Sequence, residues 1–350
     1  MSGWGKNHVV NSSNDDGAQV FPATVLRVSP RVRISLIVSG IALLVGVAVA
    51  GITAATSTDP PASVAAAPTV RPGAPPLSLD LGVRVDPEAL GLREALRLYE
   101  AGKRGEAESV FARHDSLEAR IGQSMSRWPD GTVTRLTQLA GLHPKSAAVQ
   151  LNLGLARFWA GEGGEKASWR SAAELEPDTA YAVTANNLLF PNFARNLPVF
   201  VPIENVSPAI AALAPPAQLR ALERRAREGS VTDQLFYGVA LQRLGRQRSA
   251  EQVFARTALR SPRNAEARVA AAVGLFDKAR PVTAFSRLGP LSRAFPQAAT
   301  VRFHLGLLLL WSGQVKEARR QLRLAQTVEP GSPLRGVAKR YLDELRAAGV

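Results

Sequence analysis

From Asp86 to the C-terminus, the apolar residues follow the period of amphipathic helices. The pattern also repeats itself every 34 residues. Four columns keep this spacing: Gly238, Ala272 and Gly306; Ala250, Ala284 and Ala318; Phe254, Leu288 and Leu322; and Pro262, Pro296 and Pro330. Several columns in one register indicate a structural repeat, in which each unit buries its apolar face against its neighbours.

Each column has a physical role in a pair of helices. The Gly and Ala residues are small where two helices cross closely, and Phe254, Leu288 and Leu322 fill the space between them. Gly245 and Gly313 fall where a first helix must end and turn. The Pro closes each unit because it cannot continue a helix. The expected units are therefore residues 231–264, 265–298 and 299–332.

With these residues in place, residues 231–330 resemble three consecutive tetratricopeptide repeats. The third unit matches best, through Leu305-Gly306, Gly313, Ala318, Leu322, Ala325 and Pro330. The early Trp of the family is replaced by Gln234, Arg268 and Arg302, and its usual Tyr by Leu241, Leu275 and Leu309. The resemblance implies an all-α fold, a right-handed solenoid of helical hairpins, over residues 85–350.

Upstream, the repeat is weaker but still visible. Leu153-Gly154, Gly161, Ala172 and Pro177 form a further unit. Residues 178–189 predict a first helix whose partner arrives late, at about 216–228. Between them an irregular insertion at about 190–215 breaks the repeat. Residues 333–348 predict a C-terminal capping helix, which the last repeat needs to hide its exposed face.

The N-terminal part has a different pattern. Residues 1–33 show no helical or strand period and predict a disordered cytoplasmic tail. Residues 34–55 predict a transmembrane helix, because no charge occurs between Arg33 and Asp59. Arg27, Arg31 and Arg33 lie upstream, which places the repeat domain outside the cytoplasm. A cleaved signal peptide is the alternative. Residues 56–84 predict a Pro/Ala-rich linker.

The composition gives the net charge of the chain and excludes several kinds of chemical site. The chain has 350 residues, a net charge of +14 and no Cys, so disulfides and thiolate sites are excluded. None of the four His residues has metal-site spacing, and no catalytic or phosphate-binding motif is complete. We therefore expect neither an enzyme nor a cofactor. We expect no nucleic-acid partner, because the predicted topology removes the domain from the cytoplasm.

The resemblance also implies a concave groove lined by the first helices. Mapped onto this chain, the peptide-binding groove comprises Leu235, Val239, Gln242, Arg243, Val269, Val273, Phe276, Asp277, Phe303, Leu307, Leu310 and Trp311. A largely apolar groove favours an extended or amphipathic peptide of a partner protein. The expected function is a membrane-anchored scaffold at the cell envelope. The alternative is a basic convex face that binds anionic lipid or wall polymer through Arg256, Arg260, Arg319, Arg320 and Arg323.

Two features remain open in the sequence. The insertion is rich in Phe and Val but carries Pro191, Pro198 and Pro202, so it cannot form a long helix. We expect it to lie extended on the solenoid, within the groove as a built-in ligand or as part of the binding site. In FHLGLLLLWSG, residues 303–313, Leu307, Leu310 and Trp311 exceed what the repeat needs. Either the C-terminal helix covers them or they are kept for a partner.

Overall fold

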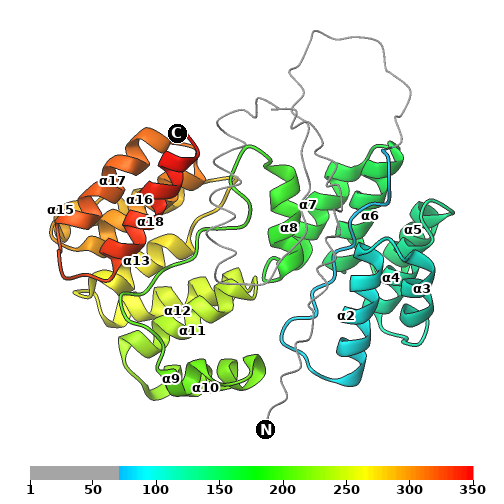
Figure 1. Ribbon diagram of the computed structural model, residues 1–350, viewed down its shortest axis with the longest axis horizontal. Helices are drawn as coiled ribbons and strands as arrows, with labels where there is room; N and C mark the ends of the chain where they lie inside the picture. Colours follow the sequence, from blue (N-terminus) through cyan, green and yellow to red (C-terminus); the bar gives the residue numbers. More distant parts are fainter. Residues whose placement is uncertain (1–70, 350) are drawn as a thin grey trace, which may run out of the picture.

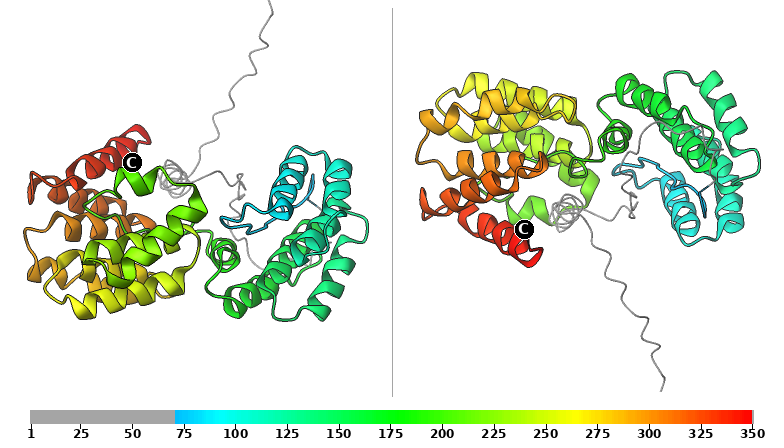
Figure 2. Two further views of the ribbon diagram at one scale, coloured as in Figure 1. Left: turned by 90° about the horizontal axis from the view of Figure 1, so that it is seen from below. Right: turned by 90° about the horizontal axis from the view of Figure 1, so that it is seen from above.

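The computed structural model describes residues 71–349, which fold into helices joined by turns and two extended segments (Figure 1). No strand occurs in this part of the chain, so the all-α expectation is confirmed for it. The predicted cytoplasmic tail, the transmembrane helix 34–55 and most of the predicted linker lie outside the described residues. The helices form two lobes, which Figure 2 shows side by side in two further views.

The first lobe, called the N-lobe, comprises residues 71–189. It contains three helical hairpins and one last helix: α2 (Pro87–Glu100) with α3 (Arg104–Phe111), α4 (Leu117–Ser126) with α5 (Thr132–Leu142), α6 (Ala147–Ala160) with α7 (Glu165–Leu175), and α8 (Ala180–Leu189). The first helices α2, α4, α6 and α8 pack on one another in turn.

The second lobe, called the C-lobe, comprises residues 190–349. Its helices are α9 (Pro208–Ala211), α10 (Pro215–Glu228), α11 (Val231–Arg243), α12 (Gln247–Arg260), α13 (Ala265–Gly274), α14 (Val282–Leu288), α15 (Leu291–Ala294), α16 (Ala299–Trp311), α17 (Val315–Thr327) and α18 (Leu334–Ala347). Helices α11 and α12 lie within the predicted unit 231–264, and α16 and α17 within 299–332. Helix α18 occupies the range predicted for the capping helix and packs on α16 and α17.

Local sequence fixes where most first helices begin. Asp86, Ser146, Thr179 and Asn264 stand just before α2, α6, α8 and α13, and each side chain accepts a backbone N–H of the first turn. Helix α16 has Ala298 in this place and no side-chain cap there. Glu329, from the end of the same unit, instead accepts the N–H of Ala299 at 3.0 Å.

The small residues of the repeat allow the two helices of a hairpin to touch. A Cβ added at Gly238 of α11 would lie 2.2 Å from the ring of Phe254 on α12. In the third unit, a Cβ at Gly306 of α16 would lie 2.9 Å from Leu322 on α17. Phe254 and Leu322 are fully buried. The columns predicted from the 34-residue period are therefore the contact points of the hairpins.

The second unit departs from its neighbours. Position 279, where the period places Gly245 and Gly313, is Ala, and α13 ends earlier, at Gly274. The chain then runs through a longer loop before α14 starts at Val282. The second helix is also divided, because Gly289-Pro290 separates α14 from α15. The loop that results carries Lys278 towards the other lobe.

The pairing of residues 178–189 with 216–228 was wrong. Helix α8 packs on α6 and α7 at the end of the N-lobe, whereas α10 packs on α11 at the start of the C-lobe. Helices α8 and α10 do not touch each other. The insertion thus lies between two helices that belong to different lobes, and each lobe has its own apolar core.

Each lobe has one extended segment packed against its helices. The first, called the docked segment, is residues 71–83, and it lies against the N-lobe. The sequence had predicted these residues to be part of the Pro/Ala-rich linker. The second, called the strap, is residues 197–206, and it lies against α11, α13 and α16 of the C-lobe. The helices are the walls of two grooves, and the chain itself supplies the segment that lies in each.

Candidate functional site

The predicted groove of the C-lobe is largely inside the protein. Ten of its twelve predicted residues are buried: Leu235, Val239, Gln242, Val269, Val273, Phe276, Phe303, Leu307, Leu310 and Trp311. Of the remaining two, Arg243 is exposed and Asp277 is partly exposed. Leu307, Leu310 and Trp311, which exceed what the repeat needs, are therefore covered by the chain itself. One cover is α18, whose Tyr341 ring lies 5.8 Å from that of Phe303.

The strap is the other cover, and it is held through its backbone. The N–H of Phe200 donates to Oε1 of Gln242 at 2.9 Å. The N–H of Val201 donates to Nε2 of His304 at 2.9 Å, and that of Ile203 to Oε1 of Glu266 at 2.8 Å. The three acceptors come from α11, α16 and α13. Each first helix of the C-lobe repeats thus contributes one hydrogen bond to the same extended segment.

Phe200 is the apolar anchor of the strap. Its side chain is 1% exposed. The ring stacks on His304 at 4.7 Å between centroids and meets Phe254 edge-on at 5.9 Å. Phe254 is the residue that fills the hairpin of α11 and α12, so the strap is continuous with the C-lobe core. The expectation that the insertion lies extended on the solenoid is confirmed for residues 197–206, whereas Pro208–Ala211 forms the short helix α9.

His304 acts here as an acceptor, which fixes its protonation state. Its Nδ1 lies 2.7 Å from the carbonyl oxygen of Thr300, so the proton is on Nδ1 and Nε2 is free to accept from Val201. Burial lowers the pKa of His304 to about 4. The imidazole is therefore neutral at neutral pH, and a proton on Nε2 would remove the acceptor that the strap uses.

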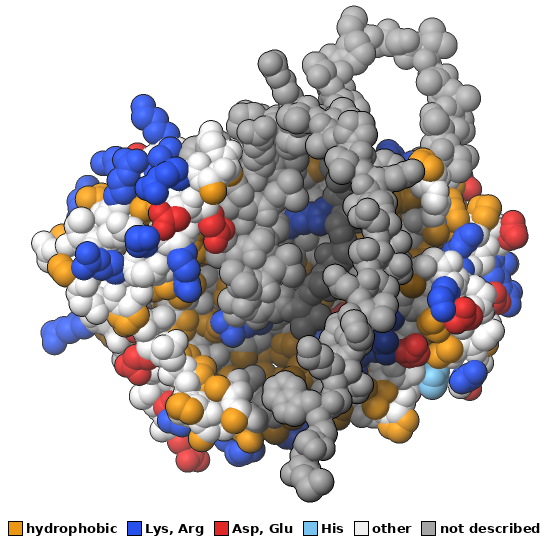
Figure 3. Space-filling model, in the orientation of Figure 1, with side chains coloured by type: hydrophobic (Ala, Val, Ile, Leu, Met, Phe, Trp, Pro, Cys, Tyr) orange, Lys and Arg blue, Asp and Glu red, His pale blue; other side chains and the backbone are white. Residues whose placement is uncertain are grey.

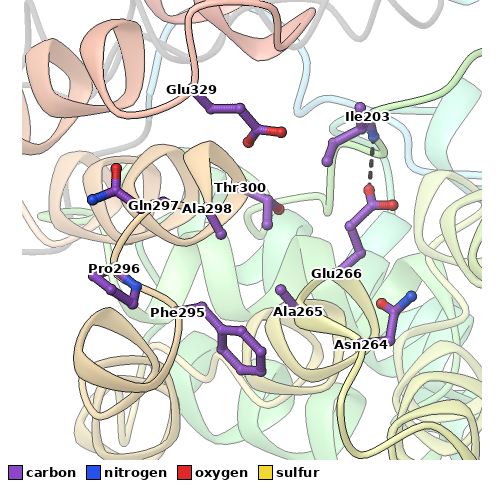
Figure 4. A pocket seen from close by; sticks show the side chains of 10 residues that line it. All are labelled: Ile203, Asn264, Ala265, Glu266, Phe295, Pro296, Gln297, Ala298, Thr300 and Glu329. Carbon is purple, nitrogen blue, oxygen red and sulfur yellow. Dashed lines mark hydrogen bonds between the residues drawn. The ribbon is translucent and has the colours of Figure 1, made fainter.

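A shallow pocket opens where the strap leaves the groove (Figure 4). Its volume is 460 Å³, and Ile203, Glu266, Phe295, Thr300 and Glu329 are among its lining residues. Burial raises the pKa of Glu266, and Glu204 and Glu329 raise it further, while the N–H of Ile203 opposes the shift. Both Glu266 and Glu329 already accept a backbone N–H. The pocket is therefore the exposed rim of the strap site.

The N-lobe groove holds the docked segment in a similar way. The side-chain amide of Asn152 on α6 accepts the N–H of Ser78 at 3.0 Å and donates to the carbonyl oxygen of the same residue at 2.8 Å. The hydroxyl of Tyr181 on α8 accepts the N–H of Asp80 at 2.9 Å. Leu77 and Leu81 are buried, at 9% and 6% exposure. Both grooves therefore recognise extended backbone through polar side chains of first helices.

Polar contacts join the two lobes. Arg246, at the turn between α11 and α12, forms an ion pair of 3.0 Å with Asp80 of the docked segment. Asp178, just before α8, accepts the N–H of Ser249 at 3.0 Å and its hydroxyl at 2.6 Å. Gly245 packs so closely on Ala180 that a Cβ there would lie 2.7 Å from the Ala180 Cα. The docked segment is thus part of the lobe–lobe contact.

Lys278 makes a further contact between the lobes. The loop after α13 brings its Nζ to 2.5 Å from Oδ1 of Asn187 on α8. The residue is 3% exposed. Burial lowers the pKa of Lys278 to about 7, and the charge of Arg195 lowers it further. The departure of the second repeat from its neighbours therefore places a buried amine at the junction of the lobes.

The five arginines predicted for the convex face lie on the second helices α12 and α17. Arg256, Arg260, Arg320 and Arg323 are exposed, and Arg319 is partly exposed. Arg320 pairs with Glu317 at 2.7 Å, and Arg260 donates to Gln234 at 3.1 Å. Figure 3 shows Lys and Arg side chains gathered at one end of the C-lobe, over α17 and α18. This end of the lobe is the most basic part of the face in view.

The described residues contain no group of three or more His, Cys, Asp and Glu side chains that could hold a metal ion. Between residues 71 and 349, no helix is both long and apolar enough to span a bilayer. The predicted span at 34–55 is not among these residues.

The comparisons with known proteins give only distant structural similarities. No protein-family model matches the chain, and no curated protein matches it significantly. Among solved structures, a tetratricopeptide repeat protein from Parabacteroides merdae is 14% identical, with a TM-score of 0.32, over 74% of this chain and 98% of that one. YrrB, described as a tetratricopeptide repeat protein with an unusual peptide-binding site, is 16% identical, with a TM-score of 0.29, over 59% and 97%.

A third solved structure, the Cut9–Hcn1 hetero-tetramer of the APC/C, is 14% identical, with a TM-score of 0.25. It matches over 73% of this chain and 55% of that one. Superpositions this loose transfer no site and no partner to the present chain. The present chain has the stacked helical hairpins that the tetratricopeptide resemblance of its sequence implies.

Sequence reasoning recognised Gln242 as a groove residue but missed the other residues that hold the two segments. Asn152 is a fully buried amide in the otherwise apolar run LNLGLA, and that isolation was a usable signal. The sequence showed only that His304 lacks metal-site spacing, and its partner on the strap, Val201, lies 103 residues away. Glu266 gave no signal, because a Glu in a first helical turn usually needs no further explanation.

Proposed function

We propose that this protein is a membrane-anchored scaffold that binds extended segments of partner proteins outside the cytoplasm. One observation carries the proposal: each lobe already binds an extended segment of the chain through hydrogen bonds to its backbone. The acceptors are Asn152 in the N-lobe and Gln242 and His304 in the C-lobe. A surface that orders the chain's own backbone has the chemistry needed to order another chain's. The proposed role is non-catalytic and needs no cofactor.

The anchor belongs to the same proposal. It is supported by the uncharged apolar run 34–55 and by the arginines before it. Membranes washed with alkaline carbonate should retain the full chain, and a chain without residues 34–55 should be released. Protease added to intact spheroplasts should digest the repeat domain. Full protection of the domain in spheroplasts, with digestion only after lysis, would place it in the cytoplasm and refute this part.

The scaffold role is tested by photo-crosslinking in native membranes. Arg243 and Asp277 retain exposure beside the C-lobe groove, whereas the groove residues behind them are buried. A photo-reactive residue at either position should capture a discrete partner protein. Leu259 on the outer helix α12 is 80% exposed and serves as the control position. Equal capture from the groove positions and from the control would contradict a groove-based scaffold.

The basic outer face supports a second candidate, the binding of anionic lipid or wall polymer. Its specific observation is the gathering of Lys and Arg over α17 and α18 (Figure 3). Arg320→Glu with Arg323→Glu, both on α17, should then weaken sedimentation with anionic vesicles, and moderate salt should have the same effect. Binding that persists at high salt favours the grooves instead.

A further inference from the structure

We propose that the junction of the two lobes is a pH-dependent hinge and that Lys278 is its sensor. The lobes close on the uncharged amine of this residue and separate more readily when the amine binds a proton. The inference goes beyond the scaffold function proposed above and does not depend on it. Because each lobe has its own groove, the hinge would set how the two grooves lie relative to each other.

Lys278 is enclosed by both lobes. It belongs to the C-lobe, in the loop between α13 and α14, but its Nζ donates to Oδ1 of Asn187 on α8 of the N-lobe at 2.5 Å. Only 3% of the residue is exposed. Closing the junction therefore removes the amine from water, and opening it returns the amine to water. The protonation of Lys278 and the closing of the lobes are thus linked by geometry.

The acceptor that Lys278 meets across the junction is uncharged. Asn196, which has a left-handed backbone with φ of 60°, donates its N–H to Oδ1 of Asn187 at 2.8 Å. Nδ2 of Asn187 donates to Oδ1 of Asn196 at 3.3 Å. These two bonds orient the Asn187 amide so that its oxygen faces Lys278. An amide oxygen can accept one N–H of the amine, but it does not neutralise the charge of an ammonium group.

The charged groups closest to Lys278 along the chain do not supply a counter-ion. Arg195, in the loop after α8, carries a positive charge that disfavours a second one on Lys278. On the loop of Lys278 itself, the carboxylate of Asp277 pairs with Arg280 at 3.8 Å. The charged amine would therefore be buried beside another cation, which is costly in a site without a carboxylate partner.

The other charged groups of the junction are bonded elsewhere. On α8 the only titratable side chain is Tyr181, whose hydroxyl accepts the N–H of Asp80. The carboxylate of Asp80 pairs with Arg246, at the turn between α11 and α12. Asp178, just before α8, accepts both the N–H and the hydroxyl of Ser249. These contacts hold the lobes together, and Lys278 adds to them the group whose charge opposes closing.

The direction of the pH effect follows from the two environments of the amine. In the closed hinge, burial lowers the pKa of Lys278 from 10.5 to about 7. In the open hinge the amine is in water and keeps its usual pKa of 10.5. Between pH 7 and 10.5 only the open form binds the proton, so closing is favoured as the pH rises. The closing equilibrium constant should increase roughly 50-fold from pH 7 to pH 9.

The N–H of Ser249 can report the opening of the hinge. It lies in the first turn of α12 and donates to Asp178 of the other lobe at 3.0 Å. The N–H of Ala267 has the same place in α13 but donates to Asn264 of its own lobe at 2.8 Å, which makes it a matched control. Hydrogen exchange of both amides is measured on the full-length chain, and each rate is divided by the intrinsic rate at that pH.

From pH 7 to pH 9, we expect the protection of the Ser249 amide to rise at least about tenfold and that of Ala267 to stay constant. Lys278→Met removes the amine and should abolish the pH dependence at Ser249. Asn187→Asp places a carboxylate where the amide oxygen accepts from Lys278, so the closed hinge then holds the ammonium group in an ion pair. This variant should protect Ser249 at least about tenfold better than the wild type at pH 7, with no further rise up to pH 9.

Constant protection of Ser249 in the wild type would overturn the proposal. So would an equal rise at Ala267, because the effect would then belong to the whole C-lobe and not to the hinge. A rise that persists in a folded Lys278→Met protein assigns the sensor to another group and also overturns it. If Lys278→Met does not fold, Asn187→Asp decides, since an unchanged pH dependence in that variant refutes Lys278 as the sensor.

Discussion

Acidification is the most specific test of the strap site, because His304 can accept the Val201 N–H only while Nε2 is unprotonated. Burial lowers the pKa of His304 from 6.5 to about 4. Above pH 6.5 the imidazole is neutral in both the folded and the unfolded chain, so pH has no effect through this group. Between pH 6.5 and 4 only the unfolded chain binds the proton, so stability falls as the pH falls.

The magnitude follows from the difference between the two pKa values. One pKa unit corresponds to about 1.36 kcal/mol, so protonation of His304 should cost the C-lobe roughly 3 kcal/mol once the pH reaches 4. At pH 4.5 about 2 to 3 kcal/mol of this loss should already be present. This is a large share of the stability of a typical domain.

Hydrogen exchange can measure this loss locally. The opening free energy of α16 is followed in the wild type and in His304→Gln, corrected for the pH dependence of intrinsic exchange. Gln can still accept through its amide oxygen but does not titrate. The difference between the two proteins should change by about 2 to 3 kcal/mol between pH 7.5 and 4.5. A difference that stays constant within about 0.5 kcal/mol would show that His304 does not hold the strap.

Two further predictions concern packing and the junction of the lobes. Gly238→Ala forces a methyl group against the Phe254 ring and should lower the free energy of unfolding by about 1–3 kcal/mol in chemical denaturation. Gly336→Ala, which has open space around it in α18, is the control and should raise that free energy by up to about 1 kcal/mol. Equal effects of the two variants would refute the close crossing of α11 and α12. Asp178→Ala removes both hydrogen bonds to Ser249, so the lobes should separate. Small-angle scattering should then show a larger radius of gyration, with no loss of helix content. An unchanged radius would mean that this contact does not hold the lobes together.

The sequence predicted the parts of the fold that depend on local pattern. The 34-residue period located the hairpins α11–α12 and α16–α17, because Gly and Ala at helix crossings and Phe or Leu beside them recur wherever two helices pack in the same way. The period failed at residues 178–228. There both helices exist, but each packs on the lobe to which it is closer along the chain, and nothing local to either helix encodes that choice.

The site was less predictable, because its specificity lies in contacts between distant residues. The apolar groove positions were recognised as a group, but the same letters suit an open groove and a closed core. What distinguishes the two is the strap, whose Phe200 fills the space between α11 and α16. Its fit could not be read from a single sequence, since the acceptors Gln242, Glu266 and His304 are common in solvent-facing positions.

The strap also imposes an order on folding. Its acceptors lie 42, 63 and 103 residues further along the chain, at Gln242, Glu266 and His304. As the chain is made from its N-terminus, the helices of the N-lobe can pack while the strap still has no groove. The strap can dock fully only after α16 has been synthesised, and contacts of such long sequence separation form slowly. A nascent chain that has reached α13 would therefore present Phe200 and its neighbours to whatever chaperone or export factor is at hand.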